Sequence, residues 1–304
     1  MRVLFMGTPD IAAECLKALV DADIDVVGVF TQPDRPKGRG MKLTPSPVKV
    51  YATERGIPVY QPTKLKKCGD LLAEIDPELI AVAAYGRILP KSILDYPKYG
   101  SINMHASLLP RWRGAAPIQR CIAAGDTLGG VTTMYMAEEL DAGDMILRAE
   151  TPITDADTGG SLHDRYAEMG GKLLVETIRR IEAGTAPRTP QPSEGIMLAP
   201  PITKEECAVD WTRPSREIFD LIRAMNPFPT AYTKYDGAPM KLYASKVGSR
   251  SGEPGCVIST DGGLEVACGD GSIVITELAA AGGKRMAADA WLRGHKVEIG
   301  TKLG

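Results

Sequence analysis

Short apolar runs alternate with segments of helical spacing over the first half of the chain, and this alternation limits the fold more than any other feature of the sequence. The apolar runs lie at residues 2–6, 24–31, 79–84, 100–104 and 130–136. Helical patterns lie at residues 11–21, 48–55, 70–75, 90–94, 116–124 and 161–182. Strands that are apolar along their whole length and alternate with helices are typical of a mostly parallel sheet covered on both faces. The first half is therefore predicted to be a doubly wound α/β domain.

The character of the sequence changes near residue 186. Five prolines and no clear periodicity mark residues 186–201 as a linker or an extended crossing segment. A short amphipathic helical pattern follows at 215–224, and then come β-prone runs separated by glycine turns, at 230–235, 241–246, 255–259, 263–268 and 273–278. Short strands at regular spacing indicate a small barrel or sandwich. We predict a catalytic α/β domain over residues 1–189, a linker over 190–205 and a β-rich domain over 206–304.

Composition narrows the class of protein further. The 304 residues carry a formal net charge of −2, which argues against a general nucleic-acid binder. Six cysteines lie far apart without metal-ligand spacing, and three histidines make a histidine-rich metal site implausible. The apolar N-terminal run is interrupted at residues 7–10, which is too early for a signal peptide or a membrane span. We expect a cytoplasmic protein with reduced thiols, no metal and no membrane contact.

One loop carries an unusual concentration of positive charge. Between residues 35 and 49 there are five cations and no acid, namely Arg35, Lys37, Arg39, Lys42 and Lys49. The loop at 32–46 is long for a strand-to-helix connection, and long loops in compact domains are often functional. A solvated charged loop would explain the charge equally well. The absence of any acid in an otherwise near-neutral chain favours a loop that contacts one anionic partner.

Polar side chains at the end of the run at 100–104 are the best candidates for chemistry, because ligands of open α/β sheets bind beyond the carboxyl ends of the strands. Asn103 and His105 are two residues apart, so an extended backbone presents both on one face. A lone histidine at a strand end is more often structural. The Asn103 amide on the same face favours a catalytic role for His105, because the two side chains could bind one reacting group together. The turn at residues 7–10 lacks the glycine pattern of dinucleotide-binding sites, which weakens that alternative.

Four acids follow the run at 130–136, and we expect their loop to open on the same side of the sheet as the loop after His105. The four are Glu138, Glu139, Asp141 and Asp144. A carboxylate there could orient the imidazole and stabilise its charged form. A cluster of acids at a strand end is usually a solvated turn, and spacing alone does not select one of them.

Longer motifs carry a resemblance to a known family. The chain contains Asn103-x-His105-x-Ser107-Leu108-Leu109-Pro110 and, further on, Leu140-Asp141-x-Gly143. It also contains Gly7-Thr8-Pro9-Asp10, Thr31-Gln32-Pro33-Asp34-Arg35-Pro36, Gly38-Arg39-Gly40, Ala84-Tyr85-Gly86-x-Ile88-Leu89-Pro90, Leu109-Pro110-Arg111-Trp112-Arg113-Gly114 and Asn226-Pro227-x-Pro229. In this order the motifs resemble the 10-formyltetrahydrofolate-dependent formyltransferases, and most of all the branch that acts on methionyl-tRNA. The resemblance covers nearly the whole chain.

The resemblance implies a Rossmann-like formyltransferase domain followed by a small C-terminal β-barrel of the OB type. It implies that Asn103, His105 and Asp141 are catalytic, which selects one acid of the four. It places the folate against Ser107, Leu108, Leu109 and Pro110, with the pterin near residues 87–89.

It also implies partners. The formyl donor would be 10-formyltetrahydrofolate, leaving as tetrahydrofolate, and the acceptor would be initiator methionyl-tRNA. Arg39 would contact the tRNA acceptor end, and the barrel would add a supporting contact. We expect a monomer without a metal.

Two other functions were compared with this one. A small amine could be the acceptor in place of tRNA, but it would need neither the basic loop nor the added domain. The missing glycine motif argues against a nucleotide-dependent dehydrogenase. The Asn/His/Asp set argues against a non-catalytic RNA-binding module, which would not need these residues.

Overall fold

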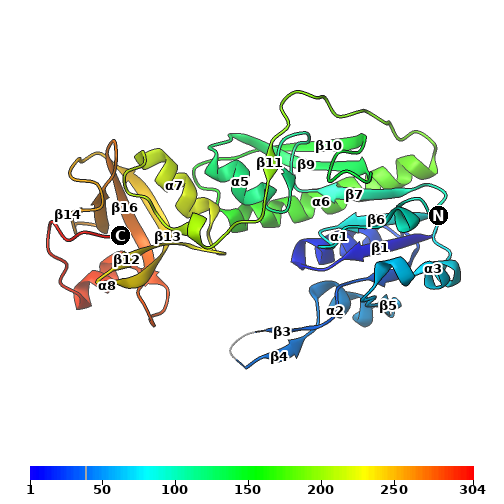
Figure 1. Cartoon of the computed structure of the whole chain (residues 1–304), viewed down its shortest axis with the longest axis horizontal. Helices are drawn as coiled ribbons and strands as arrows, with labels where there is room; N and C mark the ends of the chain where they lie inside the picture. Colours follow the sequence, from blue (N-terminus) through cyan, green and yellow to red (C-terminus); the bar gives the residue numbers. More distant parts are fainter. Residues whose placement is uncertain (38–39) are drawn as a thin grey trace. The chain divides into compact units, whose positions relative to one another are not determined.

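The computed structural model describes residues 1–37 and 40–304. These residues form two compact units, each with its own sheet and core (Figure 1). The first unit comprises residues 1–114, 129–151 and 163–198, and the second comprises 115–128, 152–162 and 199–304. The chain thus passes between the units several times.

The first unit is built on a seven-stranded sheet in the order β10-β9-β7-β6-β1-β2-β5. Its strands are β1 (Val3–Gly7), β2 (Val26–Phe30), β5 (Val59–Tyr60), β6 (Leu79–Ala83), β7 (Ser101–His105), β9 (Leu128–Tyr135) and β10 (Met145–Pro152). β1 pairs in parallel with β2 and β6, and β6 pairs in parallel with β7. Every residue of β1, β6 and β7 is buried, as expected of strands covered on both faces. The predicted doubly wound domain is confirmed.

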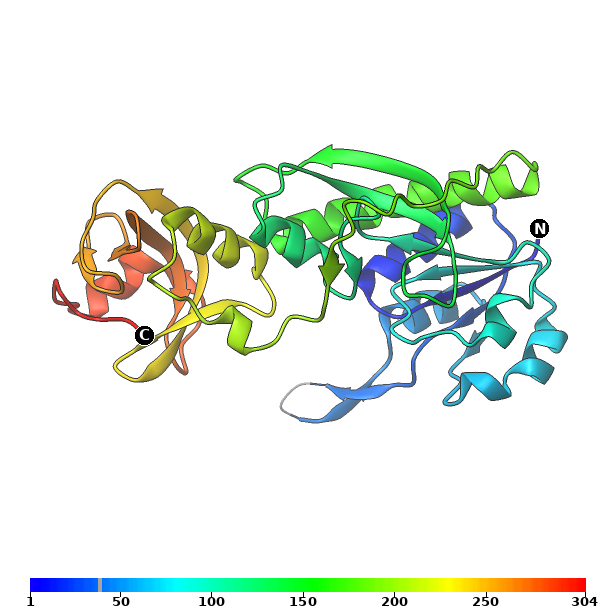
Figure 2. The ribbon, with the colours of Figure 1, turned by 45° about the horizontal axis from the view of Figure 1, so that its top comes forward.

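Helices cover the two faces of this sheet. They are α1 (Asp10–Asp21), α2 (Pro47–Glu54), α3 (Gly69–Ile75), α4 (Lys91–Leu94) and α6 (Gly159–Glu182), with a 3-10 turn η1 (Leu65–Lys67). α1 and α6 lie together (Figure 2), where a Cβ at Gly171 would be only 2.8 Å from the Ala18 Cβ. On the other face, Leu72 and Ile93 pack into one core with Ile80 of β6.

Two features of this sheet differ from the prediction. β9 runs antiparallel to β7, with His105 opposite Thr132 and Ile102 opposite Tyr135. The acidic loop therefore leaves β9 beside the amino end of β7, and the expectation that it opens beyond the carboxyl end was wrong. Strand β10 was not predicted, because its second half is edge-like, with Arg148 and Glu150 facing solvent.

The second unit is a curled antiparallel sheet that forms half a barrel, in the order β12-β13-β16-β15-β14 with β17 beside β16. Its strands are β12 (Ala231–Tyr235), β13 (Ala238–Gly248), β14 (Val257–Ser259), β15 (Leu264–Ala267), β16 (Ser272–Ala279) and β17 (Met286–Ala287). Helices α7 (Ser215–Ala224) and α8 (Ala288–Gly294) contribute Ile222 and Trp291 to its core. The five predicted β runs and the helix at 215–224 are confirmed, and the predicted barrel is an open one.

The remaining elements are short. They are α5 (Pro117–Ala123), the 3-10 turn η2 (Glu205–Cys207), and the two-residue strands β8 (Arg113–Gly114) and β11 (Leu198–Ala199), which pair with each other. Among the described residues no helix combines the length and apolar character needed to cross a bilayer.

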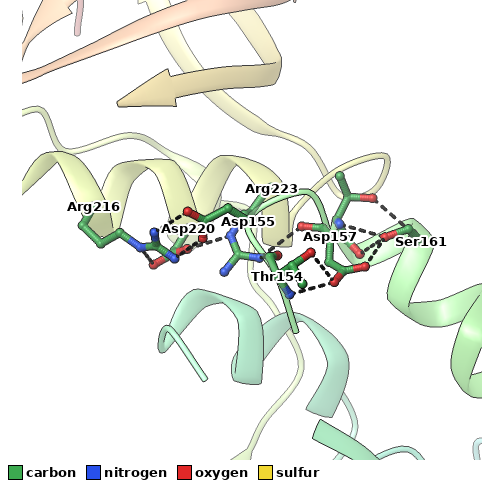
Figure 3. Close-up of polar contacts among 8 residues, drawn as sticks. Thr154, Asp155, Asp157, Ser161, Arg216, Asp220 and Arg223 are labelled. Carbon is green, nitrogen blue, oxygen red and sulfur yellow. Dashed lines mark hydrogen bonds and ion pairs between the residues drawn. The ribbon is translucent and has the colours of Figure 1, made fainter. Parts of the chain in front are cut away.

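A buried ionic network fastens residues 152–162 to α7 (Figure 3). The Arg223 guanidinium donates to Asp220 at 2.6 Å and to the Thr154 and Asp157 carbonyl oxygens at 2.9 and 3.1 Å. Arg216 extends the network to Asp155 at 2.6 Å. Buried charges are stable when each is paired and hydrogen-bonded, so this network ties an early segment firmly into the second unit.

Candidate active site

Strand β7 presents Asn103 and His105 on one face of the sheet. Both side chains are buried, with 9% and 6% of their surfaces exposed. The strand lies between β6 and β9, which fixes its backbone by pairing on both sides. Among the described residues none hydrogen-bonds the side-chain amide of Asn103. The strand thus holds rigidly a polar amide that is free to bind a ligand.

The two ring nitrogens of His105 have different partners. Nε2 lies 2.9 Å from the carbonyl oxygen of Trp112, and Nδ1 lies 3.7 Å from Asp141 Oδ2. A carbonyl oxygen only accepts hydrogen bonds, so Nε2 carries a hydrogen and donates it to Trp112. Nδ1 is then the nitrogen left for a substrate, and it can donate only when the ring is an imidazolium.

Asp141 is held in place by the backbone. Its Oδ2 accepts a hydrogen bond from the Gly114 N–H at 2.9 Å, and its side chain is 12% exposed. Met136 N–H donates to the Ser101 carbonyl at the far end of β7, so the chain must return along the strand before Asp141 reaches His105. The expected pairing therefore exists, but it arises from a loop that folds back rather than from parallel strand ends.

The other three acids face elsewhere. Glu138 lies 3.9 Å from Lys91 with 69% of its side chain exposed, and Asp144 lies 3.7 Å from Arg188. Glu139 is 78% exposed and lies 3.6 Å from the Arg113 guanidinium. Geometry thus singles out Asp141 as the acid near His105, in agreement with the resemblance.

The Ser107–Pro110 turn follows His105 directly and is rigid. The Ser107 hydroxyl donates to the Arg111 carbonyl at 2.7 Å. The Thr132 hydroxyl donates to the Ser107 carbonyl at 2.7 Å and accepts from the Leu109 N–H at 3.2 Å. Leu109 is buried, whereas Leu108 and Pro110 remain partly exposed. The turn therefore offers a fixed, partly apolar wall beside the imidazole.

A second rigid turn lies at the carboxyl end of β6. Gln32 donates to the Tyr85 and Gly86 carbonyl oxygens at 2.9 and 3.2 Å. Gly86 has φ +77°, and a Cβ there would lie 2.5 Å from Gln32 Nε2, so the position needs glycine. Burial raises the pKa of Tyr85 to about 12. This packing leaves Ile88 84% exposed, an apolar side chain that a flat aromatic ring could cover.

The basic loop is a hairpin of two short strands, β3 (Arg35–Lys37) and β4 (Lys42–Thr44), standing away from the sheet in Figure 1. These two strands were not predicted, because their charged residues obscure the alternation of apolar and polar residues that is typical of a strand. Residues 38–39 lie outside the described part of the chain, so the predicted tRNA contact Arg39 has no described geometry. Arg35 and Lys42 are exposed on the hairpin.

One of the five cations counted on this loop, Lys49, is paired within the protein. Its ammonium lies 2.7 Å from Asp34 Oδ2 and 3.0 Å from Gln61 Oε1. Gln61 in turn donates to Asp34 Oδ1 at 2.8 Å, and the hydrogen bond from Lys49 holds the pKa of Asp34 below its usual value. Asp34 lies one residue before the acid-free stretch of residues 35–49. The sequence pattern therefore did not reveal the carboxylate that neutralises Lys49. Lys49 fastens the base of the hairpin.

Within the described part of the chain, no cluster of three or more His, Cys, Asp or Glu side chains has the geometry of a metal site. Two residues that contact each other beside the Asp141 loop, Arg113 and Gln191, were not predicted as part of the site. Gln191 lies in the proline-rich stretch that sequence reasoning treated as a linker. A polar residue held between two prolines was the one signal that could have pointed to it.

Known proteins share these features. A family profile described as "Formyl transferase" matches residues 1–178, and one described as "Formyl transferase, C-terminal domain" matches residues 201–296. The chain is 49% identical over 307 residues to the methionyl-tRNA formyltransferase of Magnetococcus marinus, covering 100% of this chain and 98% of that relative. It is 50% identical over 302 residues to the enzyme of the same name from Marinobacter nauticus, covering 97% of each.

A solved structure shares the fold at much lower identity. HypX from Aquifex aeolicus, in complex with tetrahydrofolic acid, matches 98% of this chain with a TM-score of 0.65 and 18% identity. The present chain spans 50% of the length of HypX. The profiles and the full-length relatives lead to one conclusion: the chain belongs to the formyl transferase family, in its methionyl-tRNA formyltransferase branch.

Proposed function

We propose that the protein transfers the formyl group of 10-formyltetrahydrofolate to the amino group of initiator methionyl-tRNA, with Asn103, His105 and Asp141 as the catalytic residues. The observation that carries the proposal is the buried His105–Asp141 pair beside the unpartnered Asn103 amide. It lies in a chain that is 49% identical along its whole length to a methionyl-tRNA formyltransferase.

The reaction joins the acceptor nitrogen to the formyl carbon and breaks the bond from that carbon to N10 of the folate. The amine loses one proton, N10 gains one, and negative charge appears on the formyl oxygen in between. The Asn103 amide and the His105 Nδ1–H would donate to that oxygen. Preorganised donors of this kind contribute about 3–4 kcal/mol each to lowering the barrier. Asp141 would stabilise the imidazolium and help move the proton from the amine.

The surroundings of the site fit a folate. The turn of Ser107, Leu108, Leu109 and Pro110 would line the folate beside His105, and residues 87–89 would contact the pterin. Support comes from the partly exposed Leu108 and Pro110, from the 84% exposed Ile88, and from the tetrahydrofolic acid bound in HypX, which shares the fold.

The tRNA would be bound by cations on both units. Arg39 would contact the acceptor end, assisted by Arg35 and Lys42 of the same hairpin. In the second unit Lys234 and Lys241 are exposed and lie on one face of the β12–β13 pair, because Lys234 pairs with Pro239 and Tyr232 with Lys241. Contacts of this kind release counterions, so binding should weaken steeply with salt.

We further propose that the protein acts as a cytoplasmic monomer. As consecutive stretches of sequence, its domains would be the catalytic domain over 1–189, a linker over 190–205 whose first part packs on the Asp141 loop, and the tRNA-supporting β domain over 206–304, which also packs with residues 115–128 and 152–162.

Arg39→Ala tests the division of labour within this proposal. If Arg39 contacts only the tRNA, the variant should raise the KM for methionyl-tRNA about tenfold and leave the KM for the folate unchanged. Steady-state kinetics with each substrate varied in turn measures both. An equal rise in both KM values would mean that the loop shapes the active site instead.

A further inference from the structure

We propose that Gln191 is a positioning residue that, together with Arg113, sets the place of the catalytic loop carrying Asp141. The inference rests on the catalytic role proposed for Asp141. Gln191 Oε1 accepts hydrogen bonds from Arg113 Nε at 3.0 Å and Nη2 at 2.8 Å. Its Nε2 donates to the carbonyl oxygens of Asp141 at 2.7 Å and Gly143 at 2.9 Å. One side chain therefore joins a buried guanidinium to the backbone of the acidic loop.

The hydrogen-bonding capacity of this amide is fully used. A glutamine side chain has two N–H donors and an oxygen with two lone pairs, and Gln191 makes four bonds with them. Arg113 is only 8% exposed, so the oxygen satisfies two N–H groups that would otherwise be buried without a partner, while the counter-charge comes from Glu139, 3.6 Å from Nη1. No other side chain of similar size supplies two donors and a twofold acceptor at once. The contact is therefore specific for glutamine.

Two further contacts fix the loop that carries Asp141, one at Gly114 and one at Gly143. Gly114, the residue after Arg113, donates its N–H to Asp141 Oδ2 at 2.9 Å. On the opposite side Gly143 lies against β9, where a Cβ would be 1.8 Å from the Tyr135 carbonyl oxygen. The loop can follow this path only with glycine there. Gln191 provides the third contact, and together the three contacts define the position of Asp141 relative to His105.

The segment that carries Gln191 is itself fixed to the loop base. Thr189 and Met145 exchange backbone hydrogen bonds of 2.8 and 3.0 Å. The Arg188 guanidinium lies 3.9 Å from the centre of the Tyr135 ring and its Nε lies 3.7 Å from Asp144. This part of the proline-rich stretch is therefore a structural part of the active site rather than a free linker.

The expected consequence is a loss of turnover with little loss of substrate binding. Catalytic groups must be held within about 0.5 Å of their productive position, and misplacement by about 1 Å can cost a hundredfold in rate. The hydrogen bonds of the Gln191 side chain go to Arg113 and to the backbone of the loop, so its removal should act through the position of Asp141.

The test is a double-mutant cycle in the full-length protein. Gln191→Met removes all four hydrogen bonds, and Gln191→Glu keeps the acceptor for Arg113 but loses both donors to the loop. Each is made in the native background and with Asp141→Asn, and Gln119→Met serves as a matched control on α5. We expect both Gln191 variants to lower kcat for formyl transfer to methionyl-tRNA about 10- to 100-fold, with both KM values within about threefold of native. With Asp141→Asn in place, the same substitutions should change kcat less than about twofold.

The outcomes separate the two proposals. If Asp141→Asn alone keeps native turnover, the proposed catalytic role of Asp141 fails. If Asp141→Asn abolishes turnover but neither Gln191 variant lowers kcat, the positioning role fails alone. An equal loss of kcat in both backgrounds, with a lowered melting temperature for both Gln191 variants, would assign Gln191 to stability and overturn the inference.

Discussion

At the scale of single residues, the proposed mechanism requires one particular nitrogen of His105 to meet the substrate. The Trp112 carbonyl accepts from Nε2 at 2.9 Å, which leaves Nδ1, 3.7 Å from Asp141, as the nitrogen proposed to meet the substrate. The imidazole therefore acts as a donor only when it is protonated. Asp141 is the carboxylate beside this nitrogen, in a site where the histidine side chain is 7% exposed.

His105→Ala should lower kcat roughly a hundredfold or more, because it removes an oxyanion donor and the partner of Asp141. The KM for the folate should change little, since the turn at 107–110 keeps its own hydrogen bonds to Thr132. Steady-state kinetics checks both, with the partly exposed His163→Ala as the control. Turnover near the native value in His105→Ala would remove this residue from the mechanism.

Part of this site could be predicted from residues alone. The spacing of Asn103 and His105 on a buried strand indicates a shared face, and the structure has them there. The choice of Asp141 needed the resemblance, because four acids stand in one loop. The contact of Nε2 with Trp112 and the four hydrogen bonds of Gln191 depend on turn geometry and distant contacts, which no local pattern contains.

At the scale of elements, the basic hairpin combines exposed cations, which we propose bind the tRNA, with one cation that holds structure. Lys42 is exposed on β4, whereas Lys49 is paired with Asp34 at the hairpin base. Since the pKa of Asp34 is lowered by its bond with Lys49, the pair is intact above the usual aspartate pKa of about 3.9 and is lost only as the pH falls below it. Assays near neutral pH therefore examine the intact hairpin.

Lys42→Met should reduce the slope of log kcat/KM for tRNA against log salt by about 0.7–0.9, the contribution of one phosphate contact. The double variant Lys49→Met/Asp34→Asn removes a neutral pair, so it should leave that slope unchanged even if kcat/KM falls. Kinetics over a range of salt concentrations measures both slopes. The same reduction in both variants would show that Lys49 also meets phosphate.

Element positions were more predictable than element directions. The apolar runs located β1, β2, β6, β7 and β9 to within a few residues, because burial on both faces leaves a continuous apolar signal. Periodicity contains no information about strand direction, so the antiparallel course of β9 could not be read from it. Pairing partners lie far apart in sequence, and only the folded sheet reveals them.

At the scale of the whole molecule, the two compact units are not two consecutive stretches of sequence. Residues 115–128 and 152–162 belong to the second unit, and the buried Arg223 is bonded to Thr154 and Asp157 within it. Deleting residues 206–304 would therefore strip these earlier segments of their packing partners. Substitutions on the surface are the sounder way to examine what the second unit does.

Lys234→Glu/Lys241→Glu should raise the KM for methionyl-tRNA about tenfold and leave kcat and the folate KM near native values, because both side chains are exposed on one sheet face. Kinetics at fixed salt checks this, with Lys17→Glu on α1 as a charge control. An unchanged KM for tRNA would mean that this face does not contact the nucleic acid.

The acceptor of the formyl group can be identified by direct labelling. The protein is incubated with formyl-labelled 10-formyltetrahydrofolate and, in separate reactions, with charged initiator methionyl-tRNA, a phosphoribosyl glycinamide or an amino sugar. The account predicts label on the methionyl amino group of the tRNA and none above background on the small amines. Formylation of a small amine, with the charged tRNA left unlabelled, would contradict it.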